Sequence, residues 1–315
     1  MDKVLTVALP LFSMILCGYL MVRLGVIGKE TVKGLVGIVF WLFLPFFIFT
    51  KTISAPFEEG LNWTLLVAYY LPCTIVFLLS ALLGTLFWGG NSRKFFLRGL
   101  TSISGVVGYM GLPLMVMAFG DSVILPTLMI TMADNIVILA GGSLMMEMTA
   151  ARSAPSEKKK LEVLLSILKG VATNPLIFSV VFAVFYVKVQ LSLPETIMIF
   201  SNQMTTATGP LALVALGAAL ATHSESGLAK IEPLFNALFK VVLLPVLVFI
   251  SCKYIFRLPD DSVKVAVLMA ALPIAVNVYI LASRYGNYER ESSHSMLISA
   301  AIGVFTISGL LVYFE

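Results

Sequence analysis

Residues 104–120 read Ser-Gly-Val-Val-Gly-Tyr-Met-Gly-Leu-Pro-Leu-Met-Val-Met-Ala-Phe-Gly, a stretch apolar enough to lie in a lipid bilayer. Its middle contains residues that interrupt helices, because proline lacks a backbone donor and glycine makes an unwound turn cheap. We therefore expect a helix break between Gly108 and Pro113. Broken backbone survives at membrane depth only where it is buried in protein or lines a polar cavity, so this stretch predicts a functional centre.

A second stretch of the same kind, Ala271-Leu-Pro-Ile-Ala-Val-Asn277, lies far downstream. Two interrupted spans at matching places in two halves of a chain are typical of the substrate site of a secondary transporter. We expect one half-helix to begin near Pro113 and another near Pro273. Each start carries roughly half a positive charge and several free N–H groups, which together favour an anion. Two ordinary proline kinks without a ligand are the alternative.

The composition predicts an all-α polytopic membrane protein. Hydrophobic residues make up 59% of the chain and charged residues only 12%, about half the charged share of a soluble domain. The net charge of +4 comes without a basic patch interleaved with aromatic residues, so no nucleic-acid partner is expected. Apolar runs predict ten spans that each cross ~30 Å of hydrocarbon and contact membrane lipid: residues 4–22, 34–53, 62–88, 97–119, 123–147, 165–187, 194–222, 237–256, 263–283 and 295–314.

A short polar stretch, residues 150–163, is the predicted cytoplasmic linker between two halves. Residues 1–149 then hold spans one to five, and residues 164–315 hold spans six to ten. An odd number of spans per half inserts the second half upside down, so we predict an inverted repeat in which the broken spans four and nine cross. Prolines recur at nearly one offset, pairing Pro10 with Pro175, Pro45 with Pro210 and Pro113 with Pro273.

The basic residues predict the orientation. Fifteen of the 21 lysines and arginines, Arg98 and Lys240 among them, fall in the predicted connections on one side, against six on the other. By the positive-inside rule this places the first set in the cytoplasm and both termini outside. Both histidines, His223 and His294, are expected in short polar connections. With three isolated cysteines, few ligands remain for a metal, and we expect no metal site and no cofactor.

Asp134 is the only acid that we place deep inside a predicted span, and Asn135 follows it. An ionised carboxylate at that depth is expensive, so it should face a cavity, be paired or be protonated. We expect Asp134 and Asn135 to carry the coupling ion, a proton or sodium, or to contact substrate. A protonated carboxyl bonded to a neighbouring helix is the alternative.

The predicted substrate-binding residues belong to the two breaks and to one further polar stretch. Asn277, one turn past its proline, offers both a donor and an acceptor. Thr206 and Thr208 lie in Gln203-Met-Thr-Thr-Ala-Thr-Gly-Pro210, and the alternative for them is a bond back to a helix carbonyl. The full predicted set is Gly108, Tyr109, Gly111, Pro113, Thr206, Thr208, Pro273 and Asn277.

The sequence resembles the auxin efflux carrier family, in particular its short bacterial members. The matching pieces are Gly105-Val-Val-Gly-Tyr-Met-Gly-Leu-Pro-Leu114, Thr173-Asn-Pro-Leu176, Gly209-Pro-Leu-Ala-Leu213 and Ala271-Leu-Pro-Ile-Ala-Val-Asn277. The resemblance implies ten spans in five-plus-five inverted repeats, with a scaffold and a transport domain that move relative to each other. It also implies a carboxylate such as malonate or malate, with substrate near Gly111, Pro113, Pro273 and Asn277. Analogy with scaffold-and-mover carriers suggests a homodimer.

We therefore predict a secondary active transporter of a small organic anion, a mono- or dicarboxylate, in a bacterial inner membrane. The alternative is a cation–proton antiporter or sodium-coupled carrier of the same crossed-helix class, with Asp134 as its ion ligand. The sequence lacks the catalytic residues expected of an intramembrane enzyme. A protease needs a Ser–His pair or two intramembrane aspartates, and Asp134 is the only acid that we place deep inside a span.

Overall fold

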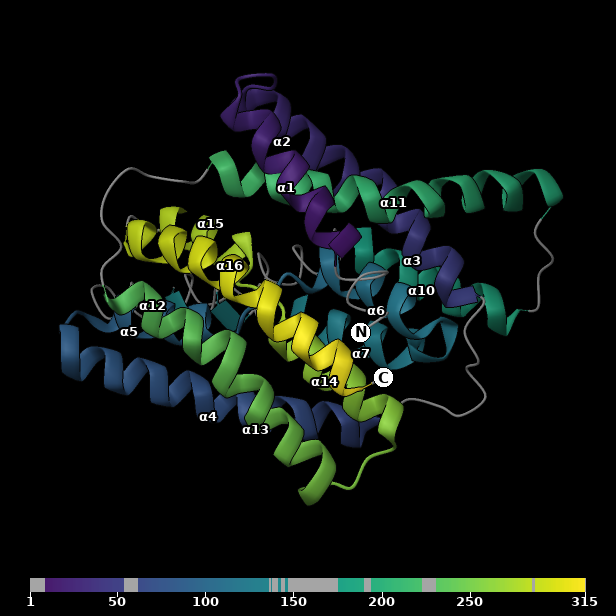
Figure 1. Cartoon of the computed structure of the whole chain (residues 1–315). Coiled ribbons are helices and arrows are strands. Elements are labelled where there is room, and N and C mark those ends of the chain that lie inside the picture. Colours follow the sequence, from purple (N-terminus) through teal and green to yellow (C-terminus); the bar gives the residue numbers. More distant parts are fainter. Residues whose placement is uncertain are drawn as a thin grey trace, which may run out of the picture.

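The computed structural model describes residues 9–53, 62–135, 137, 141–142, 145–146, 175–189, 194–222, 231–284 and 287–314. Across these ranges the regular structure is helical, and no strand occurs in them (Figure 1). The predicted linker over 150–163 and the first ten residues of the predicted span 165–187 lie outside the described residues. The division into repeats at residues 149 and 164 stays a prediction.

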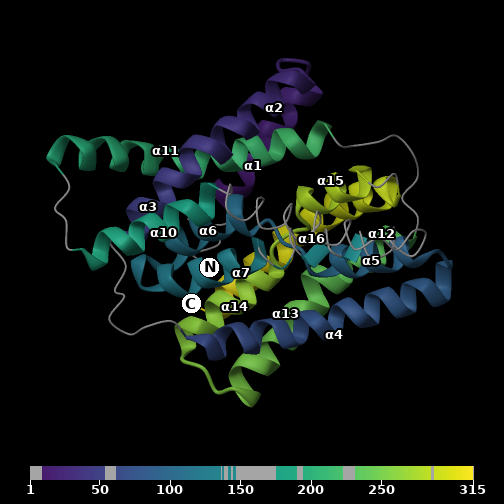
Figure 2. The ribbon, with the colours of Figure 1, turned by 180° about the vertical axis from the view of Figure 1, so that it is seen from behind.

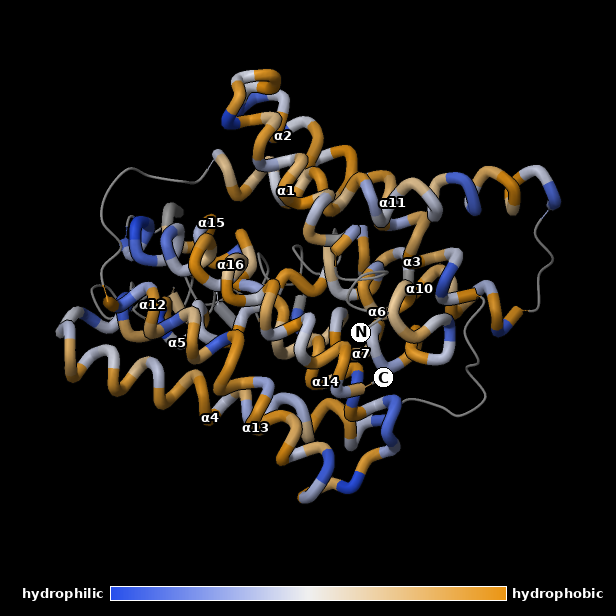
Figure 3. The backbone as a smooth tube through the Cα atoms, viewed as in Figure 1, coloured by the Kyte–Doolittle hydropathy of each residue, from blue (hydrophilic) through white to orange (hydrophobic). Residues whose placement is uncertain are grey.

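Among the described residues, five helical segments are long and apolar enough to cross a membrane, and they coincide with the predicted spans 34–53, 62–88, 194–222, 237–256 and 295–314. Figure 3 shows apolar residues along most of α4 and α13. Large apolar side chains point outward, with Leu86 77% exposed, as expected for a surface that faces lipid. The segments are Lys29–Ile53 (α2 Lys29–Ile38, η2 Val39–Phe43, α3 Leu44–Ile53), α4 Trp63–Trp88, α11 Glu195–Thr222, Ile231–Ile255 (α12 Ile231–Leu238, η7 Phe239–Leu243, α13 Leu244–Ile250, η8 Ser251–Ile255) and α16 Glu289–Tyr313.

The helices form two groups (Figures 1 and 2). In the first group, α1 (Leu9–Arg23) packs along α11, and α3 packs against both α11 and α10 (Pro175–Lys188). Glycines allow the first of these contacts, because a methyl group at Gly18 would overlap the Val214 carbonyl and one at Gly217 would overlap that of Ile15. The second group contains α4, α7 (Ile124–Asn135) and α12 to α16, with α5 (Ser92–Ile103) against α4.

In the described part of the chain two helices are interrupted, and their breaks lie against each other. The first runs from α5 through extended residues 104–106 into η4 (Val107–Gly111) and α6 (Leu112–Phe119), which leads through η5 (Asp121–Val123) to α7. The second runs from α14 (Asp260–Ala271) through residues 272–275 into α15 (Val276–Arg284). The Val106 N–H donates to the Pro273 carbonyl at 3.0 Å, and the Ala275 N–H donates to the Ser104 carbonyl at 3.2 Å.

These two hydrogen bonds form an antiparallel bridge between Gly105 and Ile274, and we call this place the crossing. At the centre of the bridge, the Ile274 N–H donates to the Ser299 Oγ of α16 at 3.0 Å. The backbone groups that the breaks release are therefore partly paired with each other, which is how non-helical backbone is kept at membrane depth.

The first break lies earlier than the predicted interval from Gly108 to Pro113. Pro113 sits inside a continuous helix, directly after the five-residue π-helical turn η4. The same arrangement recurs at Pro45 after η2 and at Pro245 after η7. A wider turn relieves the clash between a proline ring and the preceding carbonyl, so these prolines do not end their helices. Pro273 does lie in a break, and the preceding Leu272 is extended, as residues before proline tend to be.

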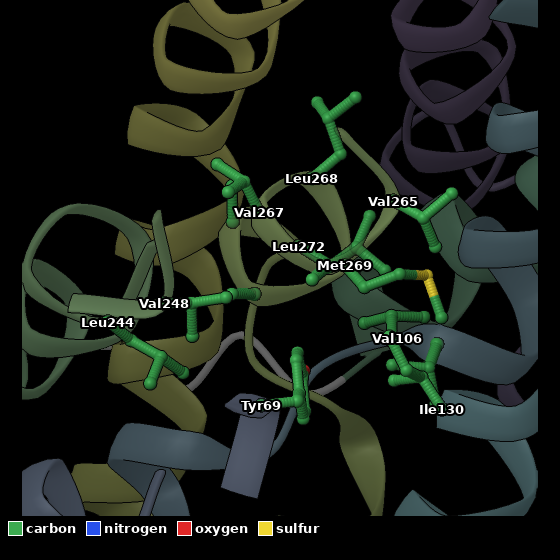
Figure 4. Packing of buried hydrophobic residues seen from close by; sticks show 14 of the residues in the cluster. Tyr69, Val106, Ile130, Leu244, Val248, Val265, Val267, Leu268, Met269 and Leu272 are labelled. Atoms are coloured by element: carbon green, nitrogen blue, oxygen red, sulfur yellow. The ribbon is translucent and has the colours of Figure 1, made fainter. Parts of the chain in front are cut away.

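Around the crossing, α14 is buried on every side, which is expected of a helix that is apolar all round. From Val265 to Leu272 each residue is at most 1% exposed. Figure 4 shows Val265, Val267, Leu268, Met269 and Leu272 among Leu244 and Val248 of α13, Tyr69 of α4 and Ile130 of α7. The helix that leads into the second break is therefore held in a closely packed apolar surround.

Three polar residues predicted in connections are instead buried inside helices. Arg98 is 1% exposed in α5, Lys240 is 0% exposed in η7, and His294 is 7% exposed in α16. The Arg98 Nε donates to Glu232 Oε1 of α12 at 2.6 Å, and its Nη1 donates to the Gly89 carbonyl at 2.7 Å. The prediction was wrong for Arg98 and Lys240 because buried polar partners, rather than water, satisfy them.

Candidate functional site

A cavity of about 110 Å³ lies beside the crossing, and we call it the crossing cavity. One wall comes from the interrupted helices, with Gly105, Val107 and Gly108 from the first and Ala275, Val276 and Asn277 from the second. Asp134 of α7 completes the polar part. The other wall is apolar and comes mainly from the first helix group, with Val36, Phe40, Leu176, Leu216 and Ala219. The cavity thus lies between the two groups.

Both half-helices begin at this cavity. The chain re-enters helix at Val107 in η4 and at Val276 in α15, and both residues line the cavity with their successors Gly108 and Asn277. The first N–H groups of a helix have no acceptor within it and carry the positive end of the helix dipole. Two such ends at one cavity make an environment that favours an anion.

The structure separates the predicted site residues into two sets. Gly108, Asn277 and Asp134 line the crossing cavity, and Gly111, Pro113 and Pro273 do not. Gly111 allows α14 to approach, because a methyl group there would lie 2.8 Å from the Met269 Sδ. Pro113 packs near Gly209, and Pro273 packs near Gly303. The side chains of Tyr109 and Asn135 lie outside the described part of the structure.

Thr206 and Thr208 also lie away from the crossing cavity. The Thr206 hydroxyl donates to the Asn202 carbonyl one turn earlier, at 2.9 Å. The Thr208 Oγ1 lies 2.7 Å from the Met204 carbonyl oxygen and 3.1 Å from that of Phe43 in η2. Both hydroxyls therefore bond back to helix carbonyls, and Thr208 also joins α11 to η2.

Sequence reasoning missed Lys240. Its ammonium donates a hydrogen bond to the Ala270 carbonyl, near the C-terminal end of α14. A methyl group at Gly105 would lie 3.2 Å from the Lys240 Nζ, so the ammonium lies next to the backbone that walls the crossing cavity. It also interacts electrostatically with Asp134. The Ala270 carbonyl is among the last of α14, which have no acceptor role within their own helix, and the ammonium of Lys240 pairs with it.

A signal for Lys240 was present in the sequence. Glu232, Asn236 and Lys240 follow one another at four-residue intervals, which places them on one face of a helix. All three are buried. Glu232 lies at the polar start of the helix, whereas Lys240 already lies in the apolar run that follows. The spacing therefore indicates that the lysine is inside the protein rather than in a connection.

Comparison with known proteins identifies the family. The family model described as "Membrane transport protein" matches residues 3–311. The chain belongs to this membrane transport protein family. A protein of Rhizobium meliloti (strain 1021) named "Putative malonate transporter" is 28% identical over 312 residues, which cover 99% of this chain and 96% of that protein. The "Uncharacterized transporter YfdV" of Escherichia coli (strain K12) is 26% identical, over 97% and 95% of the two chains.

The predicted family is thereby confirmed, since this is the auxin efflux carrier type of membrane transport family. Family membership and the five apolar helices together make the chain a multi-pass membrane protein of a transporter family. In this membrane transport protein, the crossing cavity lies within the matched residues and between the two helix groups.

Proposed function

We propose that this protein is a secondary active transporter of a small organic anion, a mono- or dicarboxylate, which binds in the crossing cavity. The single observation that supports this most is that Val107 and Gly108 at one half-helix start and Val276 and Asn277 at the other line one cavity. A carboxylate there would accept hydrogen bonds from unpaired first-turn N–H groups, and the Asn277 amide would add a donor.

The volume of the cavity supports a small substrate. A water molecule takes about 30 Å³ in the liquid, so about 110 Å³ leaves room for a solute of several non-hydrogen atoms. The name of the Rhizobium meliloti relative refers to malonate, a three-carbon dicarboxylate. We therefore place short-chain carboxylates ahead of large aromatic acids.

The arrangement of helices supports alternating access. Helix α1, the first predicted span, packs against α11, the seventh. Helix α10, the sixth predicted span, packs against α3, the second. Each pair becomes the other when the two halves are exchanged, as an inverted repeat requires, and we retain ten spans with crossed helices four and nine as part of the proposal. Movement of one helix group against the other would open the cavity to each side in turn.

We further propose that the protein lies in a bacterial inner membrane with both termini outside. Without the buried Arg98 and Lys240, thirteen of the original fifteen basic residues still fall on the side assigned to the cytoplasm, against six on the other. The asymmetry thus survives the correction. A cation carrier centred on Asp134 ranks second, because the fixed ammonium of Lys240 beside that carboxyl would repel a bound cation.

Counterflow in proteoliposomes tests the proposal. We expect purified protein to exchange labelled two- to four-carbon mono- and dicarboxylates, malonate included. An added negative charge at the α15 start should repel the anion, so Asn277→Asp should reduce exchange at least tenfold. A tenfold change corresponds to a free-energy difference of about 1.4 kcal/mol. Asn202→Asp is the matched control, since Asn202 is exposed on α11 and does not line the crossing cavity. Sodium–proton exchange without carboxylate counterflow would refute the proposal.

A further inference from the structure

Lys240 is a buried cation that the proposed function has not used so far. Its side chain is 0% exposed, and its described hydrogen bond goes to the Ala270 carbonyl. An ammonium group has three donors, so one bond to a carbonyl leaves capacity for further acceptors. Lys240 does not itself line the crossing cavity, but its Nζ lies next to Gly105, which does, so this capacity lies directly behind the cavity wall.

Asp134 is the acidic residue that interacts electrostatically with Lys240, although the two side chains make no direct ion pair among the described contacts. The other titratable groups near the pair are Tyr69, Tyr70 and Cys73 of α4 and Cys252 of η8, and these groups are neutral at neutral pH. Asp134 itself is 6% exposed and lines the crossing cavity. The site thus brings one basic and one acidic side chain together inside the membrane protein, and when both are charged each reduces the cost of burying the other.

We propose that Lys240 is a substrate-binding residue whose charge is balanced by nearby Asp134 in the substrate-free carrier and by a substrate carboxylate in the loaded one, and that Asp134 then takes up one proton. This inference rests on the proposed carboxylate transport. The substrate carboxylate is drawn by the ammonium and by the two half-helix starts at the same cavity. Once the Lys240 ammonium interacts with the substrate, Asp134 is left as a buried carboxylate without a balancing positive charge.

The proton balance follows from this exchange. A lone ionised carboxylate inside a membrane protein costs several kcal/mol, which protonation avoids. The proton comes from water on the side from which the substrate enters, since Asp134 lines the cavity that the substrate reaches. When the substrate leaves on the other side, Asp134 releases the proton to that water and pairs again with Lys240. One proton therefore accompanies each carboxylate, and no other bond forms or breaks.

The experiment compares two measurements on the full-length protein in proteoliposomes loaded with a panel of two- to four-carbon carboxylates. Counterflow at equal pH measures binding and exchange. Net uptake with the outside more acidic measures proton coupling. The variants are Asp134→Asn, Lys240→Met, Lys240→Arg and the double variant Asp134→Asn with Lys240→Met. Lys253→Met is the control, because Lys253 lies in the same long helix with its side chain 43% exposed and paired with Asp260.

We expect wild-type net uptake to accelerate when the outside is acidified. Asp134→Asn should keep counterflow within about threefold while losing this acceleration, because the amide leaves Lys240 free but takes up no proton. Lys240→Met should raise the KM for counterflow at least tenfold, and Lys240→Arg should restore part of the affinity. The double variant should show the high KM and no response to the pH gradient. A threefold change corresponds to about 0.7 kcal/mol and a tenfold change to about 1.4 kcal/mol.

The outcomes separate the two proposals. If Lys240→Met does not fold because it leaves Asp134 unpaired, the double variant, which carries no buried charge at this site, decides the question. An unchanged gradient response in Asp134→Asn, or a wild-type KM in the double variant, would overturn the partner exchange and leave carboxylate transport standing. Absence of counterflow in the wild-type protein for the whole panel would refute the proposed function itself.

Discussion

The long helix segment Ile231–Ile255 carries two buried ionisable residues, Glu232 and Lys240, each with an oppositely charged group nearby, and the two pairs differ in how fully they are bonded. In the first pair, Glu232 accepts from Arg98 at 2.6 Å and from the Tyr288 hydroxyl at 2.7 Å. In the second pair, Lys240 donates to a backbone carbonyl and faces Asp134, which lines a cavity.

The first pair is part of a continuous network. The Arg98 Nη1 also reaches the Gly89 carbonyl, and the Asn236 amide donates to the Tyr288 hydroxyl at 2.7 Å. Each bond fixes the next group, so this end of α5, α12 and α16 is cross-linked by polar contacts. The comparison teaches that burial alone does not mark a functional charge. The pair with bonding capacity left at a cavity is the one available to a ligand.

The largest effect is expected from Arg98→Met. Removing the guanidinium leaves Glu232 buried at 4% exposure without its cation, and breaking a buried pair in this way destabilises a protein by about 3–5 kcal/mol. Thermal unfolding of the detergent-solubilised protein should show a strongly lowered midpoint. The double variant Arg98→Met with Glu232→Leu should recover much of it. A wild-type midpoint for the single variant would contradict a structural role for this pair.

A smaller loss is expected from Ser299→Ala at the crossing. The change removes the acceptor of the Ile274 N–H and leaves a buried donor unpaired, at a cost of about 1–3 kcal/mol. Both the unfolding midpoint and the counterflow rate should fall, because the two breaks are held together here. Ser292→Ala is the control on the same helix, since its hydroxyl only bonds back to the Glu289 carbonyl. Equal effects of both variants would argue against a special role for Ser299.

Gly105→Ala should affect transport more than stability. The added methyl group would lie 3.2 Å from the Lys240 Nζ and 3.5 Å from the Leu272 Cβ, so the ammonium must shift by a few tenths of an ångström. We expect the KM for carboxylate counterflow to rise about threefold, or ~0.7 kcal/mol. Gly34→Ala, where a methyl group meets open space, is the control. An unchanged KM would mean that the position of the ammonium is not critical.

The smallest effect is expected at an exposed ion pair, Lys253 with Asp260. The hydrogen bond from Lys253 at 2.6 Å lowers the pKa of Asp260 below its ordinary value. A lowered pKa in the folded state contributes stability above the unfolded value of about 3.9, and this contribution is lost as the pH falls through the folded value. Because solvent screens the pair, Asp260→Asn should leave the unfolding midpoint at pH 7 nearly unchanged. A large shift there would contradict the distinction between buried and exposed pairs.

The apolar runs by themselves were enough to predict the membrane class and the five long helices. A run of about 20 apolar residues has few alternatives to a membrane helix, because every backbone group must be paired within the segment. The break at Leu272 was also predictable, since a residue before proline avoids helical backbone angles. Gly108, Asn277 and Asp134 were predicted at the site, and they line one cavity.

Only the tertiary structure placed the first break at residues 104–106 and showed that Pro113 is accommodated by a π-helical turn. It alone brought Lys240 close to Gly105, Ala270 and Asp134. These four residues lie in four different segments of the chain. The physical reason is that hydropathy is a property of each local segment, whereas the partner of a buried charge is chosen by packing. The four-residue spacing of Glu232, Asn236 and Lys240 places the lysine on a polar helix face, but it does not say which group that face meets.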